Sequence, residues 1–170
     1  MKNLVPELRK KFSSLEGLTV VDCGCGEGEK TFLLAQEGAI VTAFDKNAKL
    51  VSEVEKTAKN LGLKVETKQA LIECYESEKK FDVVLFMYVL HFVKDKDRAL
   101  ENVIKLARKG GVVIFSDLED KEKVDPDYIK YLKENLMDVK EERFEVSDEP
   151  HVGYPQPHKH QVYVLIGTKK

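Results

Sequence analysis

The stretch of residues 20–31 constrains this chain more than any other part of its sequence. It contains the end of a short apolar run whose β-branched residues are typical of a buried strand. Residues 31–37, which come next, have the pattern of a helix that Gly38 ends. Glycines occupy alternate positions between strand and helix, at Gly24, Gly26 and Gly28. Because glycine lacks a Cβ, the backbone there can turn sharply and approach a ligand, so the stretch predicts a small-molecule loop.

The spacing of these glycines separates the loop from two common nucleotide-binding loops. A dinucleotide fingerprint needs its third glycine where this chain has Glu29, and a phosphate-binding P-loop needs a Gly-Lys-Ser/Thr end that the chain lacks. Glu27 and Glu29 would also bring negative charge to the place of a pyrophosphate. The acidic loop therefore favours a ligand that carries positive charge.

A second acidic position, Asp45, follows another apolar run, residues 39–44. It stands at the carboxyl end of that predicted strand, where a carboxylate can accept hydrogen bonds from both hydroxyls of a ribose. The glycine loop and Asp45 together predict a nucleoside site.

At these residues the chain resembles class I S-adenosylmethionine-dependent methyltransferases. Residues 21–28 and 44–45 are similar to the first two motifs of that family, and residues 81–91 and 106–114 are similar to its fourth and fifth motifs. The resemblance covers about residues 15–120. Within the family it is strongest to the small-molecule branch that includes tellurite-resistance and ubiquinone-biosynthesis enzymes.

The resemblance implies an α/β fold of the Rossmann-like, doubly wound kind, with helices on both faces of a mostly parallel seven-stranded sheet whose final strand is antiparallel. It implies one domain over residues 1–170 that uses S-adenosylmethionine and releases S-adenosylhomocysteine after in-line transfer of a methyl group to a small acceptor. We expect the cofactor-binding residues to be Asp22, Cys23, Gly24, Cys25, Gly26, Gly28, Asp45, Lys46, Ala70, Leu71, Phe86 and Met87.

Adenine recognition departs from the family pattern. A carboxylate often follows the third strand in that family and accepts a hydrogen bond from the adenine amino group, but Leu71 occupies this place. Glu73 can substitute for it, or the backbone of residues 70–72 can hold the base alone.

Acceptor and catalytic residues are predicted on two segments. The expected acceptor contacts are Tyr88, His91, Asp117 and Tyr154, and the candidate bases are His91, His158 and His160. His91 can instead be an ordinary packed histidine, and Asp117 a surface acid at a strand end. The predicted loop 147–160, which contains three of the four histidines, can bind the acceptor, hold a metal, or have no chemical role. We expect no metal site, because no cysteine or acid cluster completes the coordination.

Composition limits the alternatives. The 170 residues have a net charge of −2, and the basic pairs are scattered among acids, so nucleic acid is disfavoured as a substrate. No apolar run has the length of a membrane span and the start is not a signal peptide, so we expect a cytoplasmic protein. The three cysteines, Cys23, Cys25 and Cys74, lack the spacing of a zinc site.

The remaining elements follow from periodicity and caps. We expect an opening helix at residues 3–12, capped by Asn3, which either packs on the domain or covers the active site as a lid within residues 1–14. Further helices are expected after Asn47, over residues 96–108 and after Asp125, and Gly110-Gly111 should end the second of these. Strands are expected at 63–70, 81–87, 112–116, 139–146 and 161–168, the last two as an antiparallel pair.

Two other functions remain open from the sequence. One is a non-catalytic module that binds S-adenosylmethionine or another nucleoside and regulates a partner. The other is a nicotinamide-dependent reductase, which Glu29 disfavours. Members of the resembling family that methylate amide or base nitrogens use an Asn/Asp-Pro-Pro-aromatic run, which this sequence lacks. The expected acceptor is therefore a thiol, a metalloid oxyanion, a carboxylate or another small metabolite.

Overall fold

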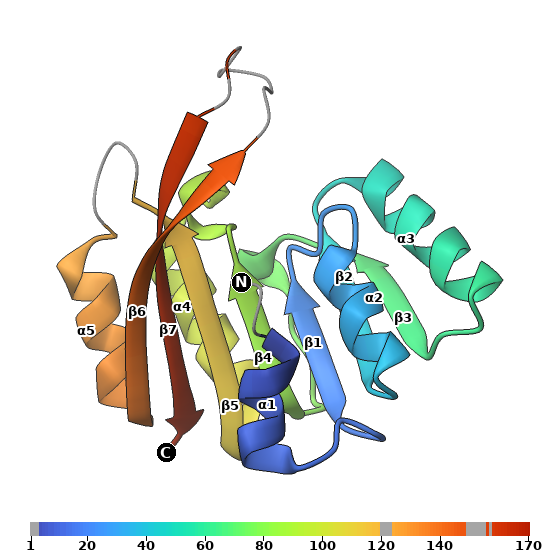
Figure 1. Ribbon diagram of the computed structural model, residues 1–170, viewed down its shortest axis with the longest axis horizontal. Helices are drawn as coiled ribbons and strands as arrows, with labels where there is room; N and C mark the ends of the chain where they lie inside the picture. Colours follow the sequence, from blue (N-terminus) through green and yellow to red (C-terminus); the bar gives the residue numbers. More distant parts are fainter. Residues whose placement is uncertain (1–3, 120–123, 149–155, 157) are drawn as a thin grey trace.

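A single sheet of seven strands organises the protein, and its strand order is β3-β2-β1-β4-β5-β7-β6 (Figure 1). The computed structural model describes residues 4–119, 124–148, 156 and 158–170. The strands are β1 (Thr19–Cys23), β2 (Ile40–Asp45), β3 (Val65–Gln69), β4 (Phe81–Met87), β5 (Ala107–Leu118), β6 (Leu136–Asp148) and β7 (His158–Lys169). The first five are parallel, and β7 is antiparallel to both β5 and β6. This is the predicted doubly wound topology.

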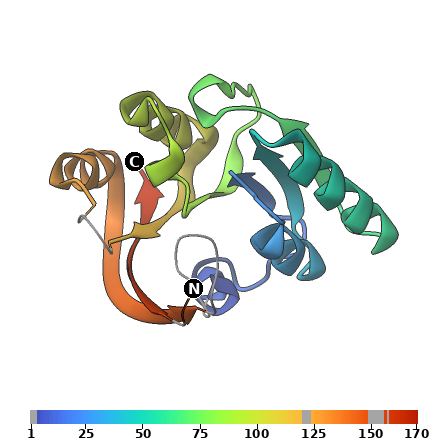
Figure 2. The ribbon, with the colours of Figure 1, turned by 90° about the horizontal axis from the view of Figure 1, so that it is seen from above.

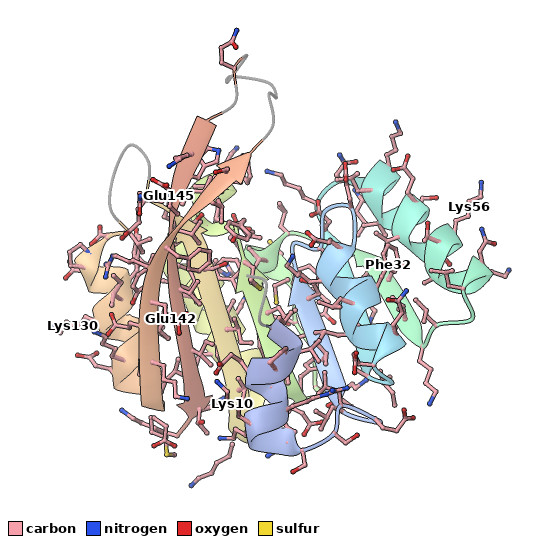
Figure 3. The ribbon with its side chains drawn as sticks, in the orientation of Figure 1. Lys10, Phe32, Lys56, Lys130, Glu142 and Glu145 are labelled. Atoms are coloured by element: carbon pink, nitrogen blue, oxygen red, sulfur yellow. The ribbon has the colours of Figure 1, made fainter. Side chains whose placement is uncertain are left out.

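Helices cover both faces of the sheet. They are α1 (Leu4–Phe12), α2 (Glu29–Gln36), α3 (Ala48–Asn60), α4 (Lys96–Leu106) and α5 (Pro126–Asn135), with short 3-10 turns η1 (Ile72–Cys74) and η2 (Leu90–Phe92). Figure 2 shows α1 and α2 on one face and α4 and α5 on the other. The charged ends of Lys56 on α3 and Lys130 on α5 point outward (Figure 3).

Two apolar clusters fill the space between sheet and helices. One joins α1 and α2 to the sheet through side chains such as Leu8, Leu34 and Ile114. The other joins α4 and α5 to the opposite face through Leu100, Leu132 and others. The inner strands are apolar on both faces because both faces are covered, which explains why β4 reads as a continuous hydrophobic run. Leu4 and Leu8 are almost fully buried, which favours the packing interpretation of the opening helix over the lid.

The helix caps predicted from the sequence are confirmed where they are described. The Asn47 side chain accepts hydrogen bonds from the Lys49 and Leu50 backbone N–H groups, and Asp125 accepts one from Asp127. Asn3 lies outside the described residues.

The end of α4 differs from the prediction. The helix ends at Leu106, and Ala107 already pairs with Phe81 as the first residue of β5, so Gly110-Gly111 lies inside the strand and does not end the helix. The ladder shifts register just after this pair. A Cβ at Gly111 would stand 2.9 Å from the carbonyl oxygens of both Arg108 and Phe81, so the irregular ladder requires glycine there.

The final strand pair is longer than predicted. β6 already begins at Leu136, which pairs with Lys169. β7 begins at His158, so His158 and His160 belong to a strand and not to the predicted loop. None of the described helices has the length and apolar character needed to cross a membrane.

Asp82 connects β4 to β1 and β5 at the amino edge of the sheet. Its carboxylate accepts hydrogen bonds from the Thr19 backbone N–H and hydroxyl, both at 2.8 Å, and from Arg108 Nε at 2.6 Å. Burial raises the pKa of Asp82, but the hydrogen bonds from Thr19 and Arg108 outweigh this effect and hold the pKa below its usual value. The charged carboxylate therefore stabilises the fold far from the ligand-binding edge.

We predict that Asp82→Ala lowers the free energy of unfolding by about 1–3 kcal/mol, because three donors lose their acceptor. Since the folded pKa is depressed, this stabilisation is present at neutral pH and is lost as the pH falls below about 4. Urea unfolding at neutral pH and at a pH below about 4 measures this change in the free energy of unfolding. Glu55→Ala, at an exposed position on α3, is the control and should change stability by less than about 0.5 kcal/mol. Equal effects of the two substitutions at neutral pH would contradict the assignment.

Candidate functional site

The glycine loop lies at the carboxyl end of β1, as predicted, and is held against β2. The backbone N–H groups of Gly24 and Cys25 both donate to the Phe44 carbonyl, at 2.8 and 3.0 Å. Gly24 and Gly26 have φ values of +78° and +53°, which L side chains rarely adopt. A Cβ at Gly24 would stand 2.6 Å from Val89, whereas nothing lies within 4 Å of the Cβ position of Gly26. Gly24 therefore permits close packing, and Gly26 borders open space.

Asp45 joins this loop to the start of α3. One carboxylate oxygen accepts a hydrogen bond from the Gly26 N–H at 3.0 Å, and the other accepts one from the Asn47 N–H at 2.9 Å. Each carboxylate oxygen has two lone-pair sites, so both oxygens keep one for the hydroxyls of a ligand. The predicted loop and acid are thus brought together.

A cavity of about 640 Å³ opens beside these residues, and its volume is within the usual range of small-molecule sites. Its walls come from the segments that follow β1, β2, β3 and β4. Its lining residues are Gly24, Gly26, Phe44, Asp45, Lys46, Asn47, Leu50, Ala70, Leu71, Ile72, Glu73, Tyr88, Val89, Phe92, Val93 and Lys94. Ligands of open α/β sheets bind at this edge, outside the carboxyl ends of the strands.

Seven of the residues predicted for cofactor and acceptor line the cavity: Gly24, Gly26, Asp45, Lys46, Ala70, Leu71 and Tyr88. The other predicted cofactor residues do not. Phe86 is fully buried and Met87 almost so, which explains why neither lines the cavity. A Cβ at Gly28 would meet Val54 and Phe32 at less than 3.0 Å, so Gly28 serves the packing of α2 on α3.

The loop is supported by three residues that do not line the cavity, Asp22, Cys23 and Cys25. The Asp22 carboxylate is 5% exposed and accepts a hydrogen bond from the Thr31 hydroxyl at 2.7 Å, which ties the end of β1 to α2. Burial raises the pKa of Asp22 to about 6, although the bond from Thr31 opposes the shift. Burial and then the charge of Asp22 raise the pKa of Cys25 to about 12, so its thiol is neutral at physiological pH.

The far end of the cavity is mostly apolar. Leu71 is 48% exposed on its wall, beside Leu50 and Ile72. The Glu73 carboxylate accepts a weak hydrogen bond from the Lys94 N–H at 3.3 Å, and the Ala70 N–H donates to the Asp45 carbonyl. Apolar walls of this kind suit a flat base, and both expectations for its polar contact, Glu73 or the backbone of residues 70–72, remain predictions.

His91 and Asp117 form a pair where β4 and β5 end. Asp117 accepts hydrogen bonds from the His91 backbone N–H at 3.0 Å and from the Leu118 N–H at 2.9 Å, and its carboxylate also contacts His91 Nδ1. Asp117 is 3% exposed, so the surface-acid interpretation is wrong. His91 follows Tyr88, which lies in the left-handed region with a φ of +60°.

Two of the other predicted residues lie on β7. His160 is 3% exposed within β7, and His158 begins the same strand. Tyr154 lies outside the described residues. In the described ranges, His, Cys, Asp and Glu side chains form no group of three that could hold a metal ion.

Sequence reasoning missed several residues that line the cavity: Asn47, Leu50, Val89, Phe92, Val93 and Lys94. They lie just past the carboxyl ends of β2 and β4, so the rule used for Asp45 could have found them. Phe92 is 65% exposed, and Lys46 Nζ lies 5.5 Å from its ring centroid.

The pKa of Asp22 is about 6 in the folded protein and 3.8 in the unfolded chain. Between pH 3.8 and about pH 6, Asp22 therefore binds more protons in the folded protein than in the unfolded chain. We predict that its stability falls as the pH rises from about 4 to above 6, by up to about 3 kcal/mol. Asp22→Asn should remove this decline and raise the free energy of unfolding at neutral pH. Urea unfolding across this range measures it, with the exposed Asp97→Asn as control. An unchanged pH dependence in Asp22→Asn would contradict the prediction.

Comparisons with known proteins agree with this geometry. A family model described as a methyltransferase domain matches residues 14–163. A ubiquinone biosynthesis O-methyltransferase from Pelagibacter ubique is 30% identical over 112 residues, which are 66% of this chain and 47% of that protein. Its counterpart from Rickettsia conorii is 30% identical over 115 residues, 68% of this chain and 40% of that protein. The matched part thus spans less than half the length of these curated relatives.

Solved structures share the fold. TehB from Haemophilus influenzae superposes with a TM-score of 0.79 at 18% identity, over 98% of this chain and 61% of that one. Magnesium protoporphyrin IX methyltransferase from Synechocystis PCC 6803, solved with bound S-adenosylmethionine, superposes with a TM-score of 0.73 at 20% identity, over 98% and 77%. Because the family model matches residues 14–163, which are most of this chain, the chain belongs to the methyltransferase-domain family.

Proposed function

We propose that this chain transfers the methyl group of S-adenosylmethionine to a small-molecule acceptor. The observation that carries the proposal is the Asp45 carboxylate, which is bonded to the Gly26 N–H at the edge of the 640 Å³ cavity. This is the place where two hydroxyls of a ribose can be bound while the rest of the nucleoside enters the cavity.

The residues that line the cavity suit two parts of the cofactor, its ribose and its adenine. Asp45 would bind the ribose, and the apolar walls around Leu50, Leu71 and Ile72 would enclose the adenine. The open space beside Gly26 admits close approach of the ligand to the backbone. When bound, S-adenosylmethionine supplies an electrophilic methyl group on a positively charged sulfur. The protein's own contribution is to align the acceptor with that methyl group and to exclude water.

The names of the relatives support a small acceptor but do not identify it. Two of them are ubiquinone biosynthesis O-methyltransferases, whose matched part is less than half of each protein. The proposal includes a single domain over residues 1–170, a cytoplasmic location, and nucleic acid as a disfavoured substrate because charges nearly balance to −2. No observation favours the non-catalytic module or the nicotinamide-dependent reductase.

Calorimetric titration tests the proposal. We expect saturable binding of S-adenosylmethionine and no comparable binding of NAD, followed by release of S-adenosylhomocysteine when an acceptor is supplied. Binding of S-adenosylmethionine without turnover on any acceptor would favour the non-catalytic module, and preference for NAD would favour the reductase.

Asp45→Ala should weaken S-adenosylmethionine binding by about 1–3 kcal/mol, which is roughly 5- to 150-fold in Kd, because the ribose hydroxyls lose their acceptor. Calorimetry at constant pH measures the change. Asp97→Ala, at an exposed position on α4, is the matched control and should bind as the wild type does. Unchanged affinity in Asp45→Ala would mean that the ribose lies elsewhere.

Gly26→Val should abolish cofactor binding, because its side chain would project into open space beside the loop; the φ of +53° strains a valine, but the protein should remain folded because no atom lies in the way. Gly24→Val should instead lower the unfolding temperature, because its side chain would collide with Val89. Thermal unfolding and calorimetry on both variants separate the two roles. Full binding by folded Gly26→Val would remove the loop from the cofactor site.

A further inference from the structure

His91 and Asp117 are in contact with each other and are not among the residues that line the cavity. The Asp117 side chain is 4% exposed, whereas that of His91 is 35% exposed. The carboxylate is held by two backbone N–H groups, those of His91 and Leu118. A buried acid that is fixed in this way orients a partly exposed imidazole.

The contact sets the tautomer of His91. An ionised carboxylate only accepts hydrogen bonds, so Nδ1, the ring nitrogen that contacts Asp117, carries the proton. In the neutral imidazole the lone pair is then on Nε2. The geometry leaves a single basic atom on the ring, and it is the one not bonded to Asp117.

The pair lies beside the cavity proposed for the methyl donor: His91 does not itself line it, but its ring centroid lies 4.0 Å from that of Phe92, which does. The residues around His91 in sequence, Val89 and Phe92, line the cavity, which occupies the ends of β1 to β4. Asp117 is on β5, the next strand along the sheet. The Tyr88 N–H donates to the Ser116 carbonyl at 2.8 Å, and the left-handed conformation of Tyr88 turns the chain so that His91 reaches Asp117. Strained residues of this kind are common at active sites.

We propose that His91 is the general base of the methyl transfer, that Asp117 positions it, and that the acceptor is a hydroxyl compound methylated on oxygen. This inference rests on the proposed function above. As the hydroxyl proton passes to Nε2, an electron pair of the oxygen forms the bond to the methyl carbon. The pair of the old carbon–sulfur bond stays on sulfur, which becomes the neutral thioether of S-adenosylhomocysteine. The imidazolium that results is stabilised by Asp117.

The hydroxyl class follows from which acceptors need such a base. An anionic acceptor has no proton to lose, and a neutral amine attacks through its own lone pair. A thiol is already partly ionised at neutral pH and is strongly nucleophilic. A hydroxyl with a pKa of about 10 or more gains most from a base that acts during the attack.

Other charged groups face the pair from the neighbouring strands. Tyr163 on β7 stands opposite Asp117 and donates to Glu141, and Arg143 on β6 bonds Glu119 at 2.8 Å. Burial raises the pKa of Tyr163, and the hydrogen bond to Glu119 raises that of Arg143. Neither group therefore changes its charge near neutral pH. The charged group of Lys46 contacts the ring of Phe92, with Nζ 5.5 Å from the ring centroid.

Nitrogen-15 NMR of the imidazole tests the positioning without any turnover. Neutral His91 should show a protonated Nδ1 and an unprotonated Nε2, and this preference should weaken in Asp117→Asn. The exposed Asp97→Asn on α4 is the control and should leave the His91 signals unchanged. A neutral His91 protonated on Nε2 in the wild type would overturn the proposal.

Methylation of phenol and of 4-nitrophenol at about pH 8 tests the base and the acceptor class together. His91→Gln should lower kcat on phenol by about 10²- to 10⁴-fold. On 4-nitrophenol, which is largely ionised, the loss should be less than about threefold, because no proton has to be removed. Affinity for S-adenosylmethionine should not change in this variant.

Equal losses on both phenols would make His91 a structural residue and overturn the proposal. Absence of methylation of either phenol by wild-type protein that binds S-adenosylmethionine would overturn the hydroxyl class. Failure of the wild type to bind S-adenosylmethionine would overturn the proposed function itself, and the two failures are therefore distinguishable.

Discussion

The hydrogen bonds of the Asp45 carboxylate are the interaction on which the site depends. Because β1 and β2 are parallel neighbours, their carboxyl ends meet at one edge of the sheet, and Asp45 reaches both the glycine loop and the start of α3. The Gly26 backbone keeps its unusual conformation partly because its N–H has this acceptor. The same carboxylate that shapes the loop thus offers its remaining lone pairs to a ligand.

Two features of this region lower the stability of the fold and are compatible with a site that binds a cation. Asp22 is buried under the loop with a raised pKa, and Tyr88 holds a left-handed conformation. Neither feature is expected to favour folding, and surrounding packing must offset both. Asp82, at the opposite edge, shows the contrast: its hydrogen bonds outweigh its burial, and its role there is structural. The buried Asp22 and the half-buried Asp82, on neighbouring strands, therefore serve different ends of the sheet.

Much of the fold was predictable, because apolar runs, caps and terminal glycines report local structure directly. Asn47, Asp125 and the bounds of β4 are examples. The end of α4 was not predictable, since Gly110-Gly111 resembles a helix stop and only the pairing of Ala107 with Phe81 reveals a strand. In the site, Gly26 and Asp45 were predicted from spacing. The bond between His91 and Asp117 was not, because it joins residues 26 positions apart, one in η2 and the other on β5.

The account depends on a nucleoside lying across the ends of β1 and β2, and a crystal structure with bound S-adenosylhomocysteine tests this most directly. We expect both ribose hydroxyls within hydrogen-bond distance of the Asp45 carboxylate, the adenine between the walls at Leu50 and Leu71, and the sulfur on the side of the cavity nearest His91. A ligand seated elsewhere on the protein, or a ribose that does not contact Asp45, would contradict the account.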